Sequence, residues 1–146
     1  MSDETHAFYH IKLVREGRAA YSETISAPTE AAAFFQKHIG HSVQEHFTAL
    51  FLNARNAPIG WREISRGSVS ASIVHPRECF LPAISLAASG IILAHNHPSG
   101  DSSPSKDDLE LTRRLVKAGE LLGIEVLDHL IIVESGFLSL KERGLM

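Results

Sequence analysis

The sequence predicts an α/β fold in which a mixed sheet lies between two layers of helices, a three-layer α/β/α sandwich. Strand and helix patterns are mixed along the 146 residues, and the strand patterns in the middle of the chain are strongly apolar. Such strands favour a buried central sheet. The length fits a single domain, expected over residues 7–146, and the polar residues 1–6 are expected to be disordered.

The N-terminal third carries no chemical signal and is expected to cover the sheet or to form a partner surface. Residues 10–14 and 20–25 flank a glycine-containing turn and predict a hairpin. Residues 29–39 predict a helix, because apolar residues recur within it and Gly40 follows as an end signal.

The middle of the chain predicts three strands. Residues 45–52 become strongly apolar, and the turn residues 53–56 lead into a second strand at 59–64. A bend at Gly67 precedes a third strand at 69–74.

The second half of the chain alternates helices with strands. Pro76 favours the start of a helix through about residue 88, and Gly90 leads into a short buried strand at 91–94. The remaining expected elements are a helix at 105–122, a strand at 124–133 and a short closing helix at 138–143.

Composition argues against several classes of protein. No apolar run approaches the length of a membrane span and the N-terminus has no secretory pattern, so a cytoplasmic protein without a membrane partner is expected. The formal net charge is -3, which gives nucleic-acid binding only weak support. The single cysteine, Cys79, excludes an internal disulfide and a cysteine-rich metal cluster, and its apolar neighbours predict a buried side chain.

Two histidines follow the apolar strand at 91–94. Successive side chains of a strand alternate between faces, so His95 and His97 leave on the same side and can offer two imidazoles to one metal ion. The prolines and the glycine that come next predict a tight loop into a helix.

The start of that helix has the form of a capping box. Ser105 is at the N-cap and Asp108 is in the first turn, where the loop can fold its carboxylate back toward the histidines. Two imidazoles and one carboxylate around an open position form the ligand set of a catalytic zinc site. Standing alone, Ser105 and Asp108 would be interpreted only as a helix cap.

The whole spacing resembles a known family. His-x-His, seven residues, Ser, two residues and Asp match the JAMM motif of the JAB1/MPN metallopeptidases, and His-Asn-His-Pro-Ser-Gly-Asp with Leu-Asp-His at 127–129 resembles their RadC-type branch. The resemblance runs from about residue 44 to the C-terminus. It implies a cytidine-deaminase-like sheet and one zinc ion per chain, held by His95, His97 and Asp108.

The resemblance also implies hydrolysis of amide bonds, with a protein or peptide as the substrate. The family's catalytic glutamate precedes an apolar strand, a position that Glu45 matches, whereas Glu63 and Glu78 are the other candidates. The alternative for Glu45 is an exposed carboxylate at a strand start. Ser105 is expected to hydrogen-bond the tetrahedral oxyanion, unless it is only the helix cap.

Other polar residues near the motif have less specific roles. Asp128 and His129 either fix the tautomer of a metal ligand or face solvent at a strand start. Asn96 points away from the two histidines and is expected to be structural, Ser99 to have only a loop role, and His75 to mark a helix entry.

Two other functions stay open from the sequence. One is a non-catalytic binding module that keeps the fold as a scaffold, although such relatives usually lose ligands and all four motif positions are filled here. The other is a DNA-repair accessory role, which the RadC-type resemblance suggests, but neither a basic groove nor a helix-hairpin-helix pattern is visible. The substrate and the oligomeric state do not follow from the sequence.

Overall fold

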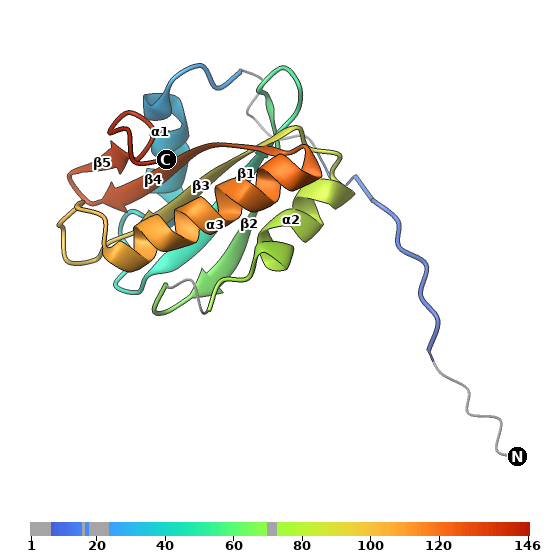
Figure 1. Cartoon of the computed structure of the whole chain (residues 1–146), viewed down its shortest axis with the longest axis horizontal. Helices are drawn as coiled ribbons and strands as arrows, with labels where there is room; N and C mark the ends of the chain where they lie inside the picture. Colours follow the sequence, from blue (N-terminus) through green and yellow to red (C-terminus); the bar gives the residue numbers. More distant parts are fainter. Residues whose placement is uncertain (1–6, 16, 18–23, 70–72) are drawn as a thin grey trace, which may run out of the picture.

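The computed structural model describes residues 7–15, 17, 24–69 and 73–146. Its elements, in chain order, are α1 (Pro28–Ile39), β1 (His46–Leu52), β2 (Pro58–Arg66), α2 (Pro76–Ser85), β3 (Gly90–Asn96), α3 (Lys106–Leu122), β4 (Glu125–Val133) and β5 (Gly136–Ser139) (Figure 1). Among the residues described, no helix has both the length and the apolar character that crossing a membrane requires.

The strands form one mixed sheet in the order β2-β1-β3-β4-β5. The central strand, β3, pairs antiparallel with β1 and parallel with β4. All seven residues of β3 are buried, as expected for a strand that is covered on both faces. The histidine-bearing end of β3 is therefore held by a neighbouring strand on each side.

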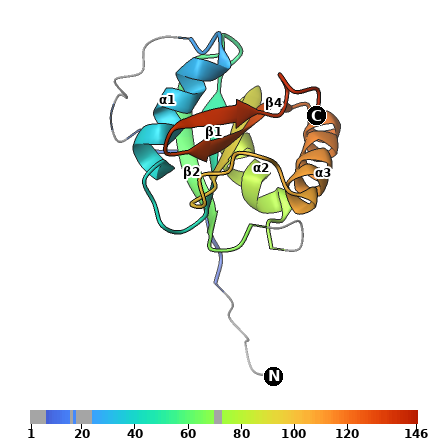
Figure 2. The same cartoon turned by 90° about the vertical axis from the view of Figure 1, so that its left-hand side faces the viewer.

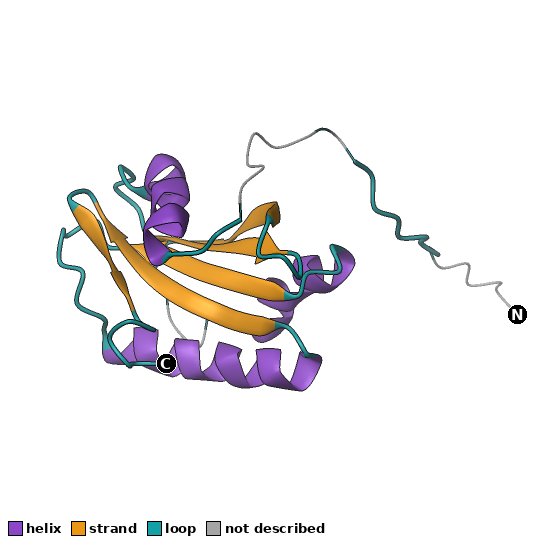
Figure 3. Cartoon of the chain, turned by 90° about the horizontal axis from the view of Figure 1, so that it is seen from above, coloured by secondary structure: helices purple, strands orange, loops and turns teal. Residues whose placement is uncertain are grey.

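Helices cover both faces of the sheet, with α1 on one side and α2 and α3 on the other (Figure 2 and Figure 3). Successive residues of β1 and β3 divide between two hydrophobic clusters. Phe47 and Leu93 pack in the cluster that includes α2 and α3, whereas Leu50 and Ile92 pack with α1. The predicted three-layer α/β/α sandwich is confirmed.

Most of the predicted elements are confirmed with small shifts at their ends. The helices expected at 29–39, 76–88 and 105–122 correspond to α1, α2 and α3, and the strands expected at 45–52, 59–64, 91–94 and 124–133 correspond to β1, β2, β3 and β4. Gly123, which follows the long helix α3, has a φ of 71° and forms a left-handed cap.

The predicted N-terminal hairpin is not formed by the residues that can be checked. Residues 10–14 lie in no strand, and their large apolar side chains are exposed. A strand needs a backbone partner, and the five-stranded sheet leaves residues 10–14 without one. Residues 1–6 and residues 20–23 of the second arm lie outside the described residues.

Two further predictions concern a strand at 69–74 and a closing helix at 138–143. Residues 70–72 of the strand expected at 69–74 lie outside the described residues, and the described ones belong to no strand. The closing helix expected at 138–143 is wrong, because residues 136–139 form β5 and pair antiparallel with β4. A short segment beside an existing strand satisfies its backbone groups by pairing, which outweighs a weak local helical tendency.

The buried thiol of Cys79 gives a first testable prediction. The side chain is fully buried, and burial, helped by the charge of Glu78, raises the pKa of the thiol to about 12. An aromatic disulfide reagent is expected to react with the folded protein at least about 100-fold more slowly than with the guanidinium-unfolded chain. Equal rates in both states would show that Cys79 is accessible in the folded protein.

Candidate metal centre

The C-terminal end of β3 and the N-terminal end of α3 lie next to each other. His95 lies in β3 and is fully buried, His97 follows the strand directly, and Asp108 is in the first turn of α3. Gly100 adopts a φ of 85°, and its amide donates to the carbonyl oxygen of His97. This left-handed turn, which suits glycine, helps to return the loop toward the histidines.

The capping box of α3 orients the Asp108 carboxylate. The Ser105 amide donates to Asp108 Oδ2 at 2.8 Å, and the Asp108 amide donates to Ser105 Oγ at 3.0 Å. The other carboxylate oxygen, Oδ1, faces His95. Asp108 therefore caps the helix and faces the histidines at the same time.

The side chains of His95, His97 and Asp108 converge. His95 Nε2 lies 2.8 Å from His97 Nε2 and 3.2 Å from Asp108 Oδ1, while His97 Nε2 lies 3.2 Å from Asp108 Oδ2. Ligand atoms around a tetrahedral zinc ion stand about 3.3 Å from one another. The three side chains thus have nearly the separation that a bound metal imposes, and they form a group that could hold a metal ion.

The hydrogen positions on His97 indicate what kind of ligand the three side chains can bind. His97 Nδ1 lies 2.8 Å from the Asp101 carbonyl oxygen, which can only accept, so Nδ1 carries the hydrogen. In the neutral ring Nε2 then presents a lone pair toward Asp108, whose ionised oxygens are also acceptors. His97 Nε2 lies 2.8 Å from His95 Nε2, so a hydrogen or a cation must stand between these two atoms. Two imidazoles and a carboxylate fit a divalent metal ion.

Charge and burial act together at Asp108. Burial by itself would raise the pKa of Asp108, but the neighbouring imidazoles of His95 and His97 hold it well below its ordinary value. The hydrogen bond to Asp108 raises the pKa of His97 against the effect of burial, and the charge of Glu45 acts in the same direction. The centre therefore contains an ionised carboxylate that favours a bound cation.

Glu45 lies just before β1, at the same end of the central strands as His97. In the β1–β3 pair Phe47 stands opposite His95, and Glu45 lies two residues before Phe47, just outside the paired residues. The negative charge of Glu45 acts on His97, so the two side chains are near each other. Its carboxylate also accepts the Val69 amide at 3.2 Å, which restrains the side chain.

Asn96 holds the backbone on both sides of Glu45. Its Oδ1 accepts the His46 amide at 2.7 Å, and its Nδ2 donates to the Gln44 carbonyl oxygen at 2.8 Å. These contacts agree with the structural role expected for Asn96. They connect β3 to the start of β1 at the level of Glu45.

The other two glutamate candidates have different surroundings. Glu63 Oε1 lies 2.6 Å from His46 Nδ1 and 2.9 Å from Arg66 Nε, and the hydrogen bond from Arg66, aided by His46, lowers the pKa of Glu63 to about 2. Glu78 is exposed in the first turn of α2, where His75 is the N-cap, as its expected helix-entry role requires. Glu63 is thus engaged in a cluster on β2, and Glu78 faces solvent.

The Ser105 hydroxyl can serve the helix and a substrate together. Its oxygen accepts the Asp108 amide through a lone pair, which does not use the hydroxyl hydrogen. Ser105 is exposed, so an oxygen atom of a bound molecule can approach it. The two roles expected for Ser105 are therefore compatible.

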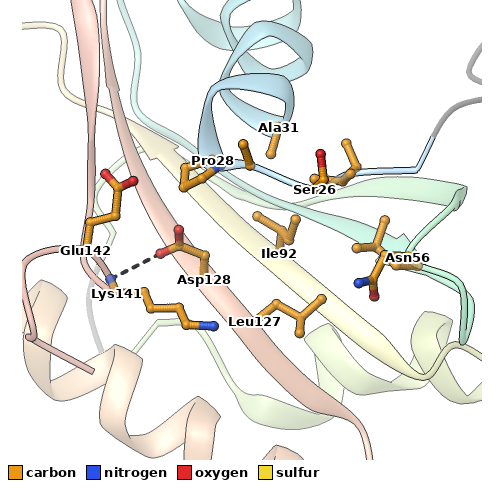
Figure 4. Close-up of a pocket in the computed structure, with 12 residues that line it drawn as sticks. Ser26, Pro28, Ala31, Asn56, Ile92, Leu127, Asp128, Lys141 and Glu142 are labelled. Atoms are coloured by element: carbon orange, nitrogen blue, oxygen red, sulfur yellow. Dashed lines mark hydrogen bonds between the residues drawn. The ribbon is translucent and has the colours of Figure 1, made fainter.

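Asp128 and His129 are neighbours in β4 but lie on opposite faces of the sheet. His129 is fully buried, with Nε2 only 2.7 Å from His95 Nδ1. Asp128 is on the α1 side, in the wall of a cavity of about 460 Å³, where it accepts the Lys141 amide at 3.2 Å (Figure 4). It also accepts the Ser139 hydroxyl at 2.6 Å. Contact with a metal-ligand candidate is thus seen for His129, whereas Asp128 is buried away from the centre.

Thr112 also contacts this centre, and the sequence interpretation did not include it. Its Oγ1 lies 2.6 Å from His129 Nδ1 and 2.6 Å from the Asp108 carbonyl oxygen. Burial lowers the pKa of His129 well below its ordinary value, which keeps the ring neutral. The four-residue spacing between Asp108 and Thr112 could have identified Thr112, because it places both on one face of a helix.

A hollow next to His97 opens toward solvent. It has a volume of about 440 Å³ and is bordered by the loop before β1 and the loop after β3, with Val43, Ser99 and Glu134 in its wall. The His97 side chain is 13% exposed, whereas that of His95 is 0% exposed. Of the two imidazoles, that of His97 is therefore the one in contact with solvent.

A family model described as RadC-like JAB domain matches residues 25–145, which include every element and candidate site residue described above. UPF0758 proteins of Bacillus mycoides (strain KBAB4), Bacillus cereus (strain 03BB102) and Bacillus anthracis (strain A0248) are each 49% identical over 121 residues. The match covers 83% of this chain and 54% of each relative, so the chain spans about half of their length.

Proposed function

The chain belongs to the RadC-like JAB domain family, which includes metallopeptidases, and from this membership we propose that it is a zinc-dependent hydrolase of peptide or isopeptide bonds. The observation that carries the proposal is the convergence of His95, His97 and Asp108, whose ligand atoms stand at nearly metal-imposed separations. Two imidazoles and one carboxylate are typical of catalytic zinc sites, which keep a position open for the reaction.

His95, His97 and Asp108 hold the metal ion in this proposal. Bound zinc would supply a Lewis acid that polarises the scissile carbonyl group and lowers the pKa of water. The ring of Phe47 stacks on His95 with centroids 6.2 Å apart and makes the inner wall of the centre apolar. Excluding water there strengthens the attraction between Asp108 and a cation.

Glu45 and Ser105 act on the substrate. The Glu45 carboxylate takes a proton from the attacking water and returns it to the leaving nitrogen, so that it is ionised again at the end of the cycle. The Ser105 hydroxyl donates to the carbonyl oxygen as negative charge develops there. The charge of Glu45 acting on His97 and the exposure of Ser105 support these roles.

The substrate in this proposal is a peptide or an extended protein tail. The hollow beside His97 is open, so a chain that continues on both sides of the scissile bond need not be enclosed. A protein tail linked through a lysine side chain satisfies the same requirement.

Metal content and hydrolysis, measured on the same preparation, test the proposal. Elemental analysis is expected to find about one zinc per chain, as for a single three-ligand site. Fluorogenic peptides and isopeptide-linked ubiquitin-like tails are then screened, with cleavage expected to stop on chelation and to return with added zinc. Iron as the resident metal, or cleavage that survives complete removal of zinc, would contradict the proposal. A zinc-loaded protein that cleaves none of these substrates would favour the non-catalytic module.

A further inference from the structure

We infer that Thr112 and His129 are positioning residues that hold His95 in the tautomer with hydrogen on Nδ1, so that its Nε2 lone pair faces the metal position before any metal arrives. The inference rests on the proposed function for its purpose, since it concerns the same centre. It is carried by three consecutive short contacts among buried groups.

The first contact fixes the Thr112 hydroxyl hydrogen. Thr112 Oγ1 lies 2.6 Å from the Asp108 carbonyl oxygen, and two oxygen atoms come this close only with a hydrogen between them. A carbonyl oxygen has no hydrogen to give, so Thr112 is the donor. Its single hydroxyl hydrogen is then committed to Asp108.

The second contact fixes the proton of His129. His129 Nδ1 lies 2.6 Å from Thr112 Oγ1, whose hydrogen is already used, so Nδ1 must donate. The ring is fully buried and its hydrogen-bond partners are a hydroxyl group and another imidazole, with no carboxylate among them. A buried imidazolium with no carboxylate in contact with it is costly, so the ring is neutral and its Nε2 has only a lone pair.

The third contact transfers this constraint to His95. His95 Nδ1 lies 2.7 Å from His129 Nε2, which can only accept, so His95 carries its hydrogen on Nδ1. His95 Nε2 then offers only a lone pair, so without a metal the hydrogen in its 2.8 Å contact with His97 belongs to His97 Nε2. The Asp101 carbonyl oxygen holds a second hydrogen on His97 Nδ1, so a metal ion has only to replace the hydrogen on His97 Nε2.

One turn of α3 therefore orients two of the three metal ligands. The side chain of Asp108 is itself a ligand, and the backbone carbonyl of the same residue starts the relay through Thr112 and His129 to His95. Outer partners of this kind fix the tautomer and orientation of metal-bound histidines. Here the outermost group of the relay is a backbone carbonyl oxygen of the helix, which can only accept a hydrogen bond.

The direct test measures tautomers in the metal-free wild-type protein. Long-range proton–nitrogen NMR spectra distinguish a ring nitrogen that carries hydrogen from one that does not, and spectra of His95→Gln and His129→Gln assign the two rings. We expect hydrogen on Nδ1 and none on Nε2 in both His95 and His129. Hydrogen on Nε2 of His95 would overturn the inference, and this outcome does not depend on whether the protein is a hydrolase.

Zinc affinity of hydroxyl variants gives a second, independent readout. Thr112→Val keeps the side-chain shape but removes the anchor, so His129 is expected to change tautomer and zinc affinity to fall about 10- to 100-fold. Thr112→Ser restores the hydroxyl and is expected to restore both the tautomers and the affinity. Unchanged affinity in Thr112→Val with the wild-type tautomers would also overturn the inference.

Thr48→Val is the matched control for Thr112→Val. Thr48 is equally buried, and its hydroxyl donates to the Ala94 carbonyl oxygen at 3.1 Å. It alternates with Phe47 and therefore points to the α1 side of the sheet, away from His95. This variant is expected to lose stability without losing zinc affinity, and equal affinity losses in Thr48→Val and Thr112→Val would mean that the effect is only structural. If the wild type itself binds no zinc, the proposed function fails, while the tautomer measurement still decides the inference.

Discussion

Replacing Asp108 with asparagine is expected to leave the purified protein almost free of zinc with its fold intact. Asparagine keeps the side-chain shape and an oxygen that can accept the Ser105 amide, so the capping contact is retained. The negative charge and the carboxylate ligand are lost. The fall in affinity should exceed the about 10- to 100-fold effect of an outer partner, because a direct ligand is removed. Elemental analysis and circular dichroism of the dialysed variant measure metal and fold.

Asp107→Asn provides the matched control for this prediction. Asp107 is the preceding residue in the same first turn of α3 and is exposed. Its substitution removes the same charge and the same favourable interaction with the helix dipole, worth about 0.3–1 kcal/mol. It is expected to retain wild-type zinc content. Full zinc in Asp108→Asn would remove the basis of the metal centre, and equal losses in both variants would assign the effect to charge near the helix start.

The fold was predictable where the local pattern and the final surroundings agree. The apolar strand at 91–94 is buried on both faces, and α3 begins after Ser105 and ends at Gly123 as its end signals indicate. The strand at residues 136–139 was not predicted, because its conformation depends on pairing with the backbone of β4. A local sequence pattern does not contain that information. The predicted strand at 10–14 has apolar residues in a suitable pattern but no partner strand in the described sheet.

The direct metal-ligand candidates were predictable because short-range rules set their directions. Strand alternation places His95 and His97 on one side, and a capping box directs Asp108 back toward them. The contact of His129 with His95 spans 34 residues and depends on the parallel pairing of β3 with β4. Strand order of this kind does not follow from motif spacing. Alternation alone does imply that Asp128 and His129 separate, so that only one of them can reach the centre.

Replacing Glu45 with glutamine is expected to lower the rate of amide hydrolysis by about 100- to 10,000-fold at unchanged zinc content. Glutamine has nearly the same size and keeps an oxygen for the Val69 amide, so the backbone around it should hold. It cannot take a proton from water at neutral pH. The turnover rate on a substrate from the screen and the zinc content are measured on the same sample.

Glu63→Gln and Glu78→Gln are the controls that give the Glu45 result its meaning. Glu78 is exposed on α2, so its variant tests for a general effect of removing one negative charge. Glu63 contacts His46, the residue next to Glu45, so its variant tests whether disturbing this part of β1 is enough to stop hydrolysis. A large loss confined to Glu45→Gln would support the proton-transfer role. An equal loss in Glu63→Gln would mean that the neighbourhood matters more than the Glu45 carboxylate, and unchanged turnover in Glu45→Gln would exclude Glu45 as the base.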